Sequence, residues 1–302
     1  MKLNLQPISN VLGVLVTIIG MSMFMCIPVS MFHHAGDAGA LFKSGCIASI
    51  FGILAWKYKF KSSAEVTKRE GYLIVVLGWI CMAIFGSLPY YFSGVAHGVT
   101  NSFFESMSGL TTTGATIFAD IEFLPKGILF WRSMTQWIGG MGIIVLTVAL
   151  FPLLGIAGIE LFVAESPGPT SDKLHPRIKE TAKRLWFIYV GLTALLFVVL
   201  LIEGMTGYDA INHALTTMAT GGFSTKNASI AYFSNPLIQY TIILFMILAG
   251  TNYTIIYYSF KGKFDKVVGS DEWRMYMFLI VVFASILAIG CLLYTSPSPR
   301  DS

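Results

Sequence analysis

Residues 3–32 contain no charged side chain, and this long apolar run constrains the fold more than any other feature of the chain. A helix needs about 20 mostly apolar residues to cross the hydrocarbon core of a bilayer. The composition agrees, because 55% of the residues are hydrophobic and only 12% are charged. Such values are atypical of soluble domains. The chain is therefore expected to be an all-α integral membrane protein.

Further apolar stretches have the length and composition of membrane spans. The predicted spans cover residues 3–32, 38–56, 71–92, 133–159, 185–202, 236–260 and 275–294. An integral membrane enzyme would need ionisable side chains at mid-depth, and these spans offer none. The four cysteines lie in apolar stretches and form no CxxC pair, so neither a metal site nor a disulfide framework is indicated.

Lysine and arginine residues concentrate in alternate loops, and cytoplasmic loops of membrane proteins carry an excess of both. The loops at 57–70, 160–184 and 261–274 are rich in both. The loops at 94–131 and 204–235 contain only Lys126 and Lys226, and Arg132 lies at the start of the span that follows residue 131. The amino terminus and the basic loops are therefore predicted to be cytoplasmic. Binding of lipid headgroups by the basic clusters is compatible with the same topology.

An internal repeat appears where the two outer loops are aligned without a gap. "NSFFESMSGLTTTGAT" (101–116) matches "DAINHALTTMATGGFS" (209–224) at an offset of 108 residues. Each copy starts with a helix N-cap residue, Asn101 or Asp209, and ends in a Thr/Gly segment. Downstream, each copy has a proline before a span and a glycine, Gly139 or Gly250, within it. Each unit is expected to be span, short helix, Thr/Gly segment and span.

The short helix of each unit is too short to cross a bilayer and is expected to be re-entrant. Irregular backbone at membrane depth is tolerated only where it is buried in protein or lines a watery cavity. The negative end of the helix would favour a cation there, and glycine would let consecutive carbonyls turn toward one axis. The alternative is a plain extracellular loop. Two copies in matching context favour the pore.

These units, with the motifs "TTTGAT", "ATGGFST" and "FWRSMTQWIGGMGI", resemble the Trk/Ktr/HKT superfamily of potassium transporters, and the two additional spans at the start resemble its Trk branch. The resemblance implies a pseudo-fourfold cation pore made by four such repeats. It also implies a potassium filter, which comprises Thr112, Thr113, Gly114, Ala115, Thr220, Gly221, Gly222 and Phe223. In the superfamily, serine in place of the filter glycine of the first repeat accompanies sodium permeation.

The resemblance further implies a homodimer gated by a cytoplasmic nucleotide-binding regulatory ring, embedded in membrane lipids and without a nucleic-acid partner. Potassium would be the substrate, with no cofactor and no covalent chemistry. The sequence thus predicts potassium uptake across the plasma membrane, in a bacterium the inner membrane. A sodium-permeable or poorly selective cation pathway and a non-conducting membrane scaffold are the alternatives.

Several polar residues near the Thr/Gly segments have two interpretations each. Glu105 and His213, at equivalent positions of the two short helices, would either hydrogen-bond behind the segments or make a polar contact to a neighbouring span. Arg132 would either tune the pore mouth electrostatically or, as we expect, be an interface anchor. Asp120 and Glu122 would either concentrate cations or belong to a solvated loop. The glycines of "WIGGMG" would allow close helix approach.

The expected organisation follows from these features. Two additional helices (1–69) precede a first pore repeat (70–160), a cytoplasmic linker (161–184), a second repeat (185–262), the first helix of an incomplete third repeat (271–294) and a tail (295–302). The tail "TSPSPRDS" follows a membrane helix abruptly and is expected to be foreign to the protein. A fragment with two repeats is expected not to conduct by itself.

Overall fold

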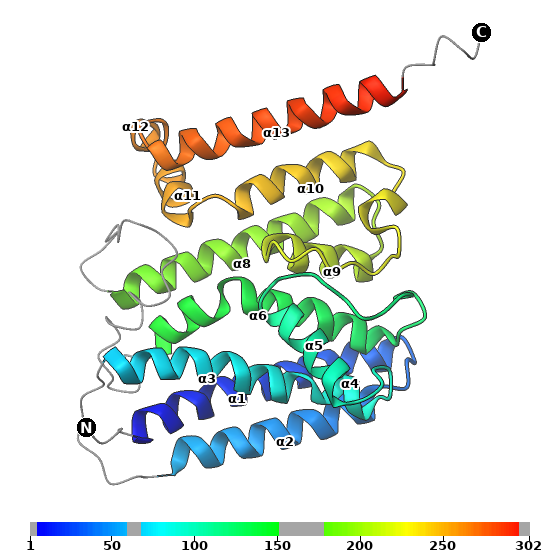
Figure 1. Cartoon of the computed structure of the whole chain (residues 1–302), viewed down its shortest axis with the longest axis vertical. Coiled ribbons are helices and arrows are strands. Elements are labelled where there is room, and N and C mark those ends of the chain that lie inside the picture. Colours follow the sequence, from blue (N-terminus) through cyan, green and yellow to red (C-terminus); the bar gives the residue numbers. More distant parts are fainter. Residues whose placement is uncertain (1–4, 59–67, 151–177, 296–302) are drawn as a thin grey trace. The chain divides into compact units, whose positions relative to one another are not determined.

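The chain is described from a computed structural model that covers residues 5–58, 68–150 and 178–295. Within these ranges every regular element is a helix, which confirms the all-α prediction (Figure 1). The helices are α1 (Leu5–Phe32), α2 (Ala38–Lys57), α3 (Lys68–Gly86), α4 (Leu88–Phe92), α5 (Val99–Leu110), α6 (Lys126–Leu150), α8 (Ile178–Ile202), α9 (Gly207–Met218), the 3₁₀-helix η2 (Ser229–Tyr232), α10 (Pro236–Ala249), α11 (Tyr253–Phe260), α12 (Phe264–Val268) and α13 (Asp271–Thr295).

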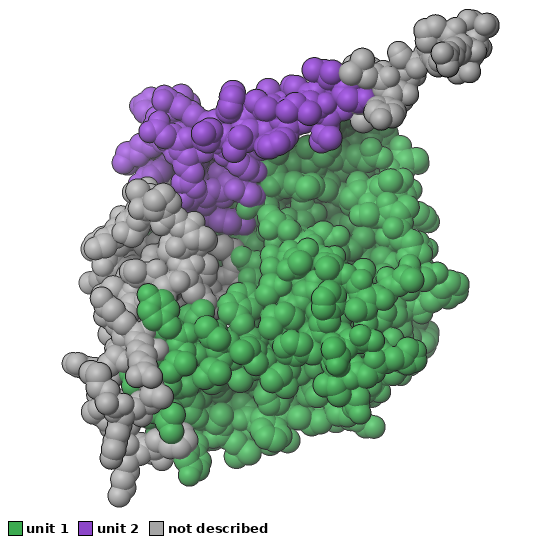
Figure 2. Space-filling view, viewed as in Figure 1, with its two compact units in different colours: residues 1–249 green, residues 250–302 purple. Residues whose placement is uncertain are grey.

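The chain forms two compact units, Met1–Ala249 and Gly250–Ser302, which Figure 2 shows in different colours. We call them unit 1 and unit 2. Unit 1 contains both Thr/Gly segments. Residues 161–177 of the predicted linker and 296–302 of the predicted tail lie outside the described residues.

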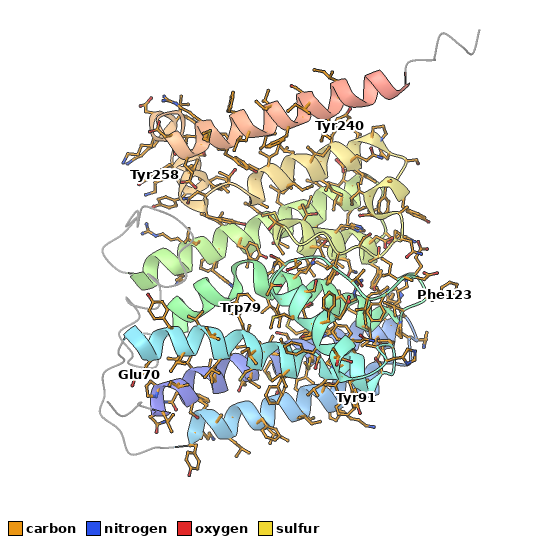
Figure 3. All side chains as sticks on the ribbon, viewed as in Figure 1. Glu70, Trp79, Tyr91, Phe123, Tyr240 and Tyr258 are labelled. Carbon is orange, nitrogen blue, oxygen red and sulfur yellow. The ribbon has the colours of Figure 1, made fainter. Side chains whose placement is uncertain are left out.

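Several helices of the described chain are long and apolar enough to cross a membrane. Five meet this criterion there: Leu5–Phe32, Ala38–Lys57, Glu70–Phe92, Lys183–Ile202 and Asp271–Gly290. Large apolar side chains such as Tyr91 and Tyr240, which are 49% and 71% exposed, cover outward faces of unit 1 (Figure 3). Exposed apolar surface on this scale is the expected surface toward lipid.

The fourth and fifth predicted spans both begin seven residues earlier in the structure than expected. The fourth begins at Lys126 rather than at residue 133, directly after Pro125, because proline is favourable just before or in the first turn of a helix. The fifth begins at Ile178 rather than at residue 185 and so takes in part of the predicted linker.

The sixth predicted span, residues 236–260, is wrong as one continuous helix. α10 ends at Ala249, and α11 begins at Tyr253. The intervening sequence is Gly-Thr-Asn, three poor helix formers. The carbonyl of Asn252 accepts a hydrogen bond from the amide of Ile255 at 2.8 Å, so a new helix starts there.

Glycine lines the seam between α1 and α2. Gly13 and Gly20 on α1, and Gly45 and Gly52 on α2, are each spaced seven residues apart, or two helical turns. A Cβ atom on Gly52 would lie 2.6 Å from the amide nitrogen of Thr17 and 2.7 Å from the carbonyl oxygen of Gly13. The two backbones therefore approach as closely as helices with small residues at their interface can.

We expect Gly52→Ala to lower the stability of the purified chain in detergent by about 1–3 kcal/mol, because the added methyl would push the two backbones apart. Thermal unfolding measures the effect. Gly39→Ala on the same helix is the control, because no atom lies within 4 Å of a Cβ atom there. Equal unfolding temperatures for the two variants would contradict the close approach of α1 and α2.

A carboxylate fixes the α1–α2 hairpin to the first predicted repeat. Asp37, in the short connection between α1 and α2, is only 4% exposed. Its Oδ2 accepts a hydrogen bond from the amide of Ile128 at 2.6 Å, and its Oδ1 accepts one from the hydroxyl of Ser30. A negative charge is favourable at a helix amino terminus, so Asp37 stabilises the first turn of α6.

Candidate functional site

The short helices α5 and α9 lie toward the same end of unit 1 and lead into irregular backbone (Figure 1). We define segment one as residues 111–116 and segment two as residues 219–224.

The predicted N-caps are wrong: α5 begins at Val99, before Asn101, and Thr206 caps α9, where its hydroxyl accepts from the amide of Asp209 at 3.1 Å. Asp209 lies in the first turn instead, where its charge remains favourable.

The backbone of the two segments follows the same course. Thr112 and Thr220 both have a φ of 54°, and two residues later Gly114 and Gly222 have φ values of 77° and 78°. Positive φ is uncommon for any residue except glycine, and rarer still for β-branched ones. Its recurrence at matching threonines indicates a backbone geometry that the surrounding structure enforces.

The helix ends that hold this backbone also match. The amide of Thr113 donates to the carbonyl of Ser108 at 3.0 Å, and the amide of Gly221 donates to that of Thr216 at the same distance. Both pairs are related by the 108-residue offset. The repeat found in the sequence is therefore a repeat of local structure.

The segments meet each other at Gly114. A Cβ atom there would collide with the carbonyl oxygen of Gly221. Of the predicted filter residues, Thr112, Thr113, Gly114, Ala115, Thr220 and Gly222 are exposed or half-buried, and Gly221 and Phe223 are buried. Two of their carbonyls are already engaged. That of Ala115 accepts a hydrogen bond from the hydroxyl of Ser108 at 2.6 Å, and that of Gly221 accepts one from Nε2 of Gln136 at 2.8 Å.

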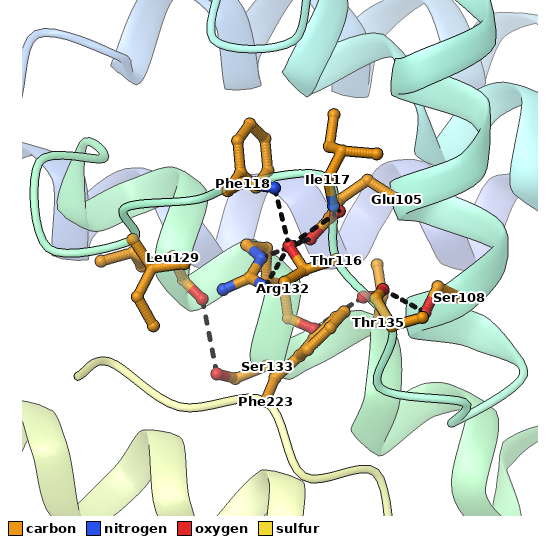
Figure 4. A network of polar contacts seen from close by, with 12 residues as sticks. Glu105, Ser108, Thr116, Ile117, Phe118, Leu129, Arg132, Ser133, Thr135 and Phe223 are labelled. Carbon is orange, nitrogen blue, oxygen red and sulfur yellow. Dashed lines mark hydrogen bonds and ion pairs between the residues drawn. The ribbon is translucent and has the colours of Figure 1, made fainter. Parts of the chain in front are cut away.

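Glu105 lies behind segment one and is fully buried (Figure 4). Its carboxylate accepts hydrogen bonds from the hydroxyl of Thr116 at 3.0 Å and from the amide of Ile117 at 3.0 Å. It also pairs with Nε of Arg132 on the neighbouring helix α6 at 2.7 Å. Both interpretations of Glu105 thus hold: it bonds to the segment and contacts the neighbouring span.

Arg132 is not the interface anchor that the sequence suggested. Its side chain is buried, with 1% of the residue exposed, and Nη2 donates to the hydroxyl of Thr116 at 3.1 Å. The guanidinium carbon lies 4.1 Å from the centre of the Phe223 ring, a cation–π distance. The reason is that α6 begins at Lys126, which places Arg132 in its second turn, opposite Glu105. Arg132 therefore connects segment one with segment two.

His213 occupies the same place behind segment two. Its Nδ1 donates to the carbonyl of Asp209 at 2.8 Å, and its Nε2 lies 3.0 Å from the hydroxyl of Ser224, the counterpart of Thr116. Because the Asp209 carbonyl can only accept, Nδ1 carries the proton of the neutral ring and Nε2 accepts from Ser224. Segment two is thus supported by a neutral group where segment one is supported by an ion pair.

Gln136 is a functional candidate that the sequence analysis missed. It lies on α6, is fully buried, and forms hydrogen bonds through both amide atoms to the backbone of segment two. Nε2 donates to the carbonyl of Gly221 at 2.8 Å, and Oε1 accepts from the amide of Phe223 at 3.1 Å. Its spacing was the available signal, since residues four apart on a helix, such as Arg132 and Gln136, share a face.

The paired glycines of "WIGGMG" bring α6 against the ends of both short helices. A Cβ atom on Gly139 would collide with the carbonyl of Leu110, the last residue of α5. A Cβ atom on Gly140 would lie 2.8 Å from Cα of Ala219, the residue after α9. The prediction of close approach at these glycines is confirmed.

The acidic residues of the loop between α5 and α6 hold the loop between α9 and α10. Oδ1 of Asp120 accepts from Nδ2 of Asn227 at 2.9 Å, and Oε1 of Glu122 accepts from the amide of Asn227 at 3.0 Å. The amide of Ile121 donates to Oδ1 of Asn227 at 2.9 Å. These carboxylates therefore have a structural role in connecting the two repeats. In the part of the chain that the structure describes, no group of three or more His, Cys, Asp or Glu side chains could hold a metal ion.

Unit 1 thus has the features of an all-helical, multi-pass membrane protein. In it, the irregular segments of two tandem repeats come together. Residues 38–281 match the family described as TrkH, cation transport protein. The chain belongs to this family, which confirms the resemblance seen in the sequence.

Named relatives agree with the family. The chain is 42% identical over 291 residues to the Trk system potassium uptake protein TrkH of Escherichia coli, covering 94% of this chain and 60% of that protein. It is 39% identical over 263 residues to TrkH of Halomonas elongata, covering 86% and 55%. The crystal structure of the potassium transporter TrkH from Vibrio parahaemolyticus matches with a TM-score of 0.75 and 33% identity, covering 99% of this chain and 62% of that one. The chain spans about 60% of the length of these relatives.

Proposed function

We propose that segments one and two line the ion pathway of a potassium uptake protein in the plasma membrane. The observation that carries this proposal is the repeated left-handed backbone, at Thr112 and Gly114 and again at Thr220 and Gly222. Such angles let consecutive carbonyls turn to one side, and rings of carbonyls can replace the hydration shell of potassium. The relatives, which are named as potassium uptake proteins, support the same choice of ion.

The proposed filter carbonyls belong to Thr112, Thr113 and Gly114 of segment one and to Thr220, Gly221 and Gly222 of segment two. Ala115 and Phe223 are the last predicted filter residues of the two segments: the Ala115 carbonyl accepts from the hydroxyl of Ser108, and the Phe223 ring packs under the guanidinium of Arg132. The two segments belong to the proposed first and second pore repeats, at 70–160 and 185–262. In this proposal the protein is a homodimer, and a cytoplasmic nucleotide-binding subunit regulates the pathway, as the resemblance implies.

A chimera tests the function directly. In it, the matched part of this chain replaces the corresponding part of the Escherichia coli relative. We expect the chimera to restore growth of a potassium-uptake-deficient bacterium in low potassium and to take up rubidium in preference to sodium. Equal uptake of sodium would favour the poorly selective pathway. A chimera that reaches the membrane and takes up neither ion would favour the non-conducting scaffold.

The proposed orientation has a separate test. We expect single cysteines placed at 94–131 and 204–235 to react with an impermeant thiol reagent in intact cells, because these loops face outward. Cysteines placed at 57–70, 160–184 and 261–274 should react only after the cells are opened, because basic loops stay on the cytoplasmic side. Labelling of the basic loops in intact cells would overturn the cytoplasmic amino terminus.

A further inference from the structure

The side chain of Gln136 belongs to the first repeat, yet both of its hydrogen bonds go to the second. It is carried by α6, the span that follows segment one. Its amide bonds to Gly221 and Phe223 of segment two, residues 85 and 87 positions later in the sequence. A primary amide that donates to one backbone carbonyl and accepts from the amide two residues on holds that stretch of backbone at two points.

Gly221 leaves the space that Gln136 fills. A Cβ atom on Gly221 would lie 2.6 Å from Nε2 of Gln136 and would collide with its amide carbon and oxygen. The counterpart of Gly221 in segment one is Thr113, whose side chain is present and whose hydroxyl lies 2.8 Å from that of Thr111. The middle of segment one is therefore supported by its own side chain, that of Thr113, whereas the middle of segment two is supported by Gln136.

Gln136 also lies at the contact between the two segments. The Gly221 carbonyl that accepts its hydrogen bond is the one that a Cβ atom on Gly114 would strike. Nε2 of Gln136 lies 4.0 Å from that same Cβ position. In the second repeat the matching residue is Ile247, three residues before Gly250 as Gln136 is three before Gly139, and an isoleucine side chain cannot form hydrogen bonds.

We propose that Gln136 is a positioning residue that sets the spacing between segments one and two and thereby the size of ion that the pathway accepts. The proposal rests on the assignment of these segments as a filter. Gln136 holds the Gly221 carbonyl at a fixed place beside Gly114, so loss of either hydrogen bond lets segment two shift. A filter that can shift inward accommodates the smaller sodium ion.

The first test uses the chimera and measures a ratio of ions, which does not depend on how much protein folds. We expect Gln136→Leu, which keeps the size of the side chain but removes both hydrogen bonds, to raise sodium uptake relative to rubidium about tenfold. Gln136→Asn retains the amide on a shorter side chain and should shift the ratio in the same direction. The control is Gln239→Leu, because Gln239 on α10 donates to the carbonyl of Phe233, outside the segments. An unchanged ratio in Gln136→Leu would overturn the proposal.

The second test uses the purified 302-residue chain and does not depend on conduction. Gly221→Ala alone should lower the unfolding temperature, because the added methyl displaces Gln136 from its two hydrogen bonds. In the Gln136→Ala background, where the space beside Gly221 is empty, Gly221→Ala should lower the unfolding temperature by clearly less. Additive effects of the two substitutions would show that Gln136 does not occupy this position, whatever the chimera transports. The two substitutions can be coupled in the purified chain while the chimera fails to transport. That result would leave the position of Gln136 intact, and it would overturn the proposed function together with the selectivity role.

Discussion

Gly114→Ser in the chimera is expected to abolish most of the preference for potassium over sodium. Two effects act together at this glycine. Its φ of 77° is strained for any residue with a side chain, and its added Cβ atom would collide with the carbonyl oxygen of Gly221 in the neighbouring segment. Strain of this kind costs about 1–3 kcal/mol, and ~1.4 kcal/mol corresponds to a tenfold change in a ratio.

Uptake of rubidium and sodium measured side by side gives the selectivity directly. Gly94→Ser is the matched control, because Gly94 has a similar φ of 73° but no atom within 4 Å of a Cβ position. It tests the strain without the collision and outside the segments. If both variants keep the selectivity of the parent chimera, segment one does not form part of the filter.

Arg132→Met is expected to destabilise the purified chain by about 3–5 kcal/mol, because it leaves the buried carboxylate of Glu105 without its ion-pair partner. Arg132 and Glu105 form their bond at 2.7 Å with side chains that are 2% and 0% exposed. The double variant Glu105→Leu/Arg132→Met removes both charges and should regain part of the loss, since burial of an ion pair is itself costly.

Thermal unfolding in detergent measures the single and double variants. Arg274→Met provides the comparison, because Arg274 and Asp271 form an exposed pair at 3.7 Å with side chains 62% and 98% exposed. Exposed pairs contribute little, so this change should leave the unfolding temperature nearly unchanged. If Arg132→Met and Arg274→Met lower the unfolding temperature by similar amounts, the ion pair between Arg132 and Glu105 does not stabilise segment one.

The spans and the repeat could be predicted because they depend on features that a sequence carries locally. Apolar length identifies a span without any knowledge of its neighbours, and the 108-residue match aligns Glu105 with His213 in the sequence. The contacts of both residues with the hydroxyl eleven positions later, Thr116 and Ser224, then follow from the short distance along the chain.

The sequence could not reveal contacts that depend on the tertiary arrangement. An arginine near the end of a span looks the same whether it extends to the interface or pairs with a buried carboxylate, so the expectation for Arg132 is wrong. The four-residue spacing places Gln136 on the same helix face as Arg132, but no local pattern reports that it bonds to residues of the next repeat. The break after Ala249 does not emerge from the sequence because overall hydropathy outweighs three residues of low helix propensity.

The hydrogen bond between Asp37 and Ile128 has a consequence for the biosynthesis of the protein. Asp37 leaves the ribosome 91 residues before the amide that it binds. Until α6 enters the membrane, the hairpin of α1 and α2 presents a carboxylate whose partner does not yet exist. We expect the hairpin to insert first with Asp37 in contact with water and to bury it only when α6 arrives. The amino-terminal hairpin would then act as a template that receives the first repeat, so that the order of translation and the order of assembly coincide.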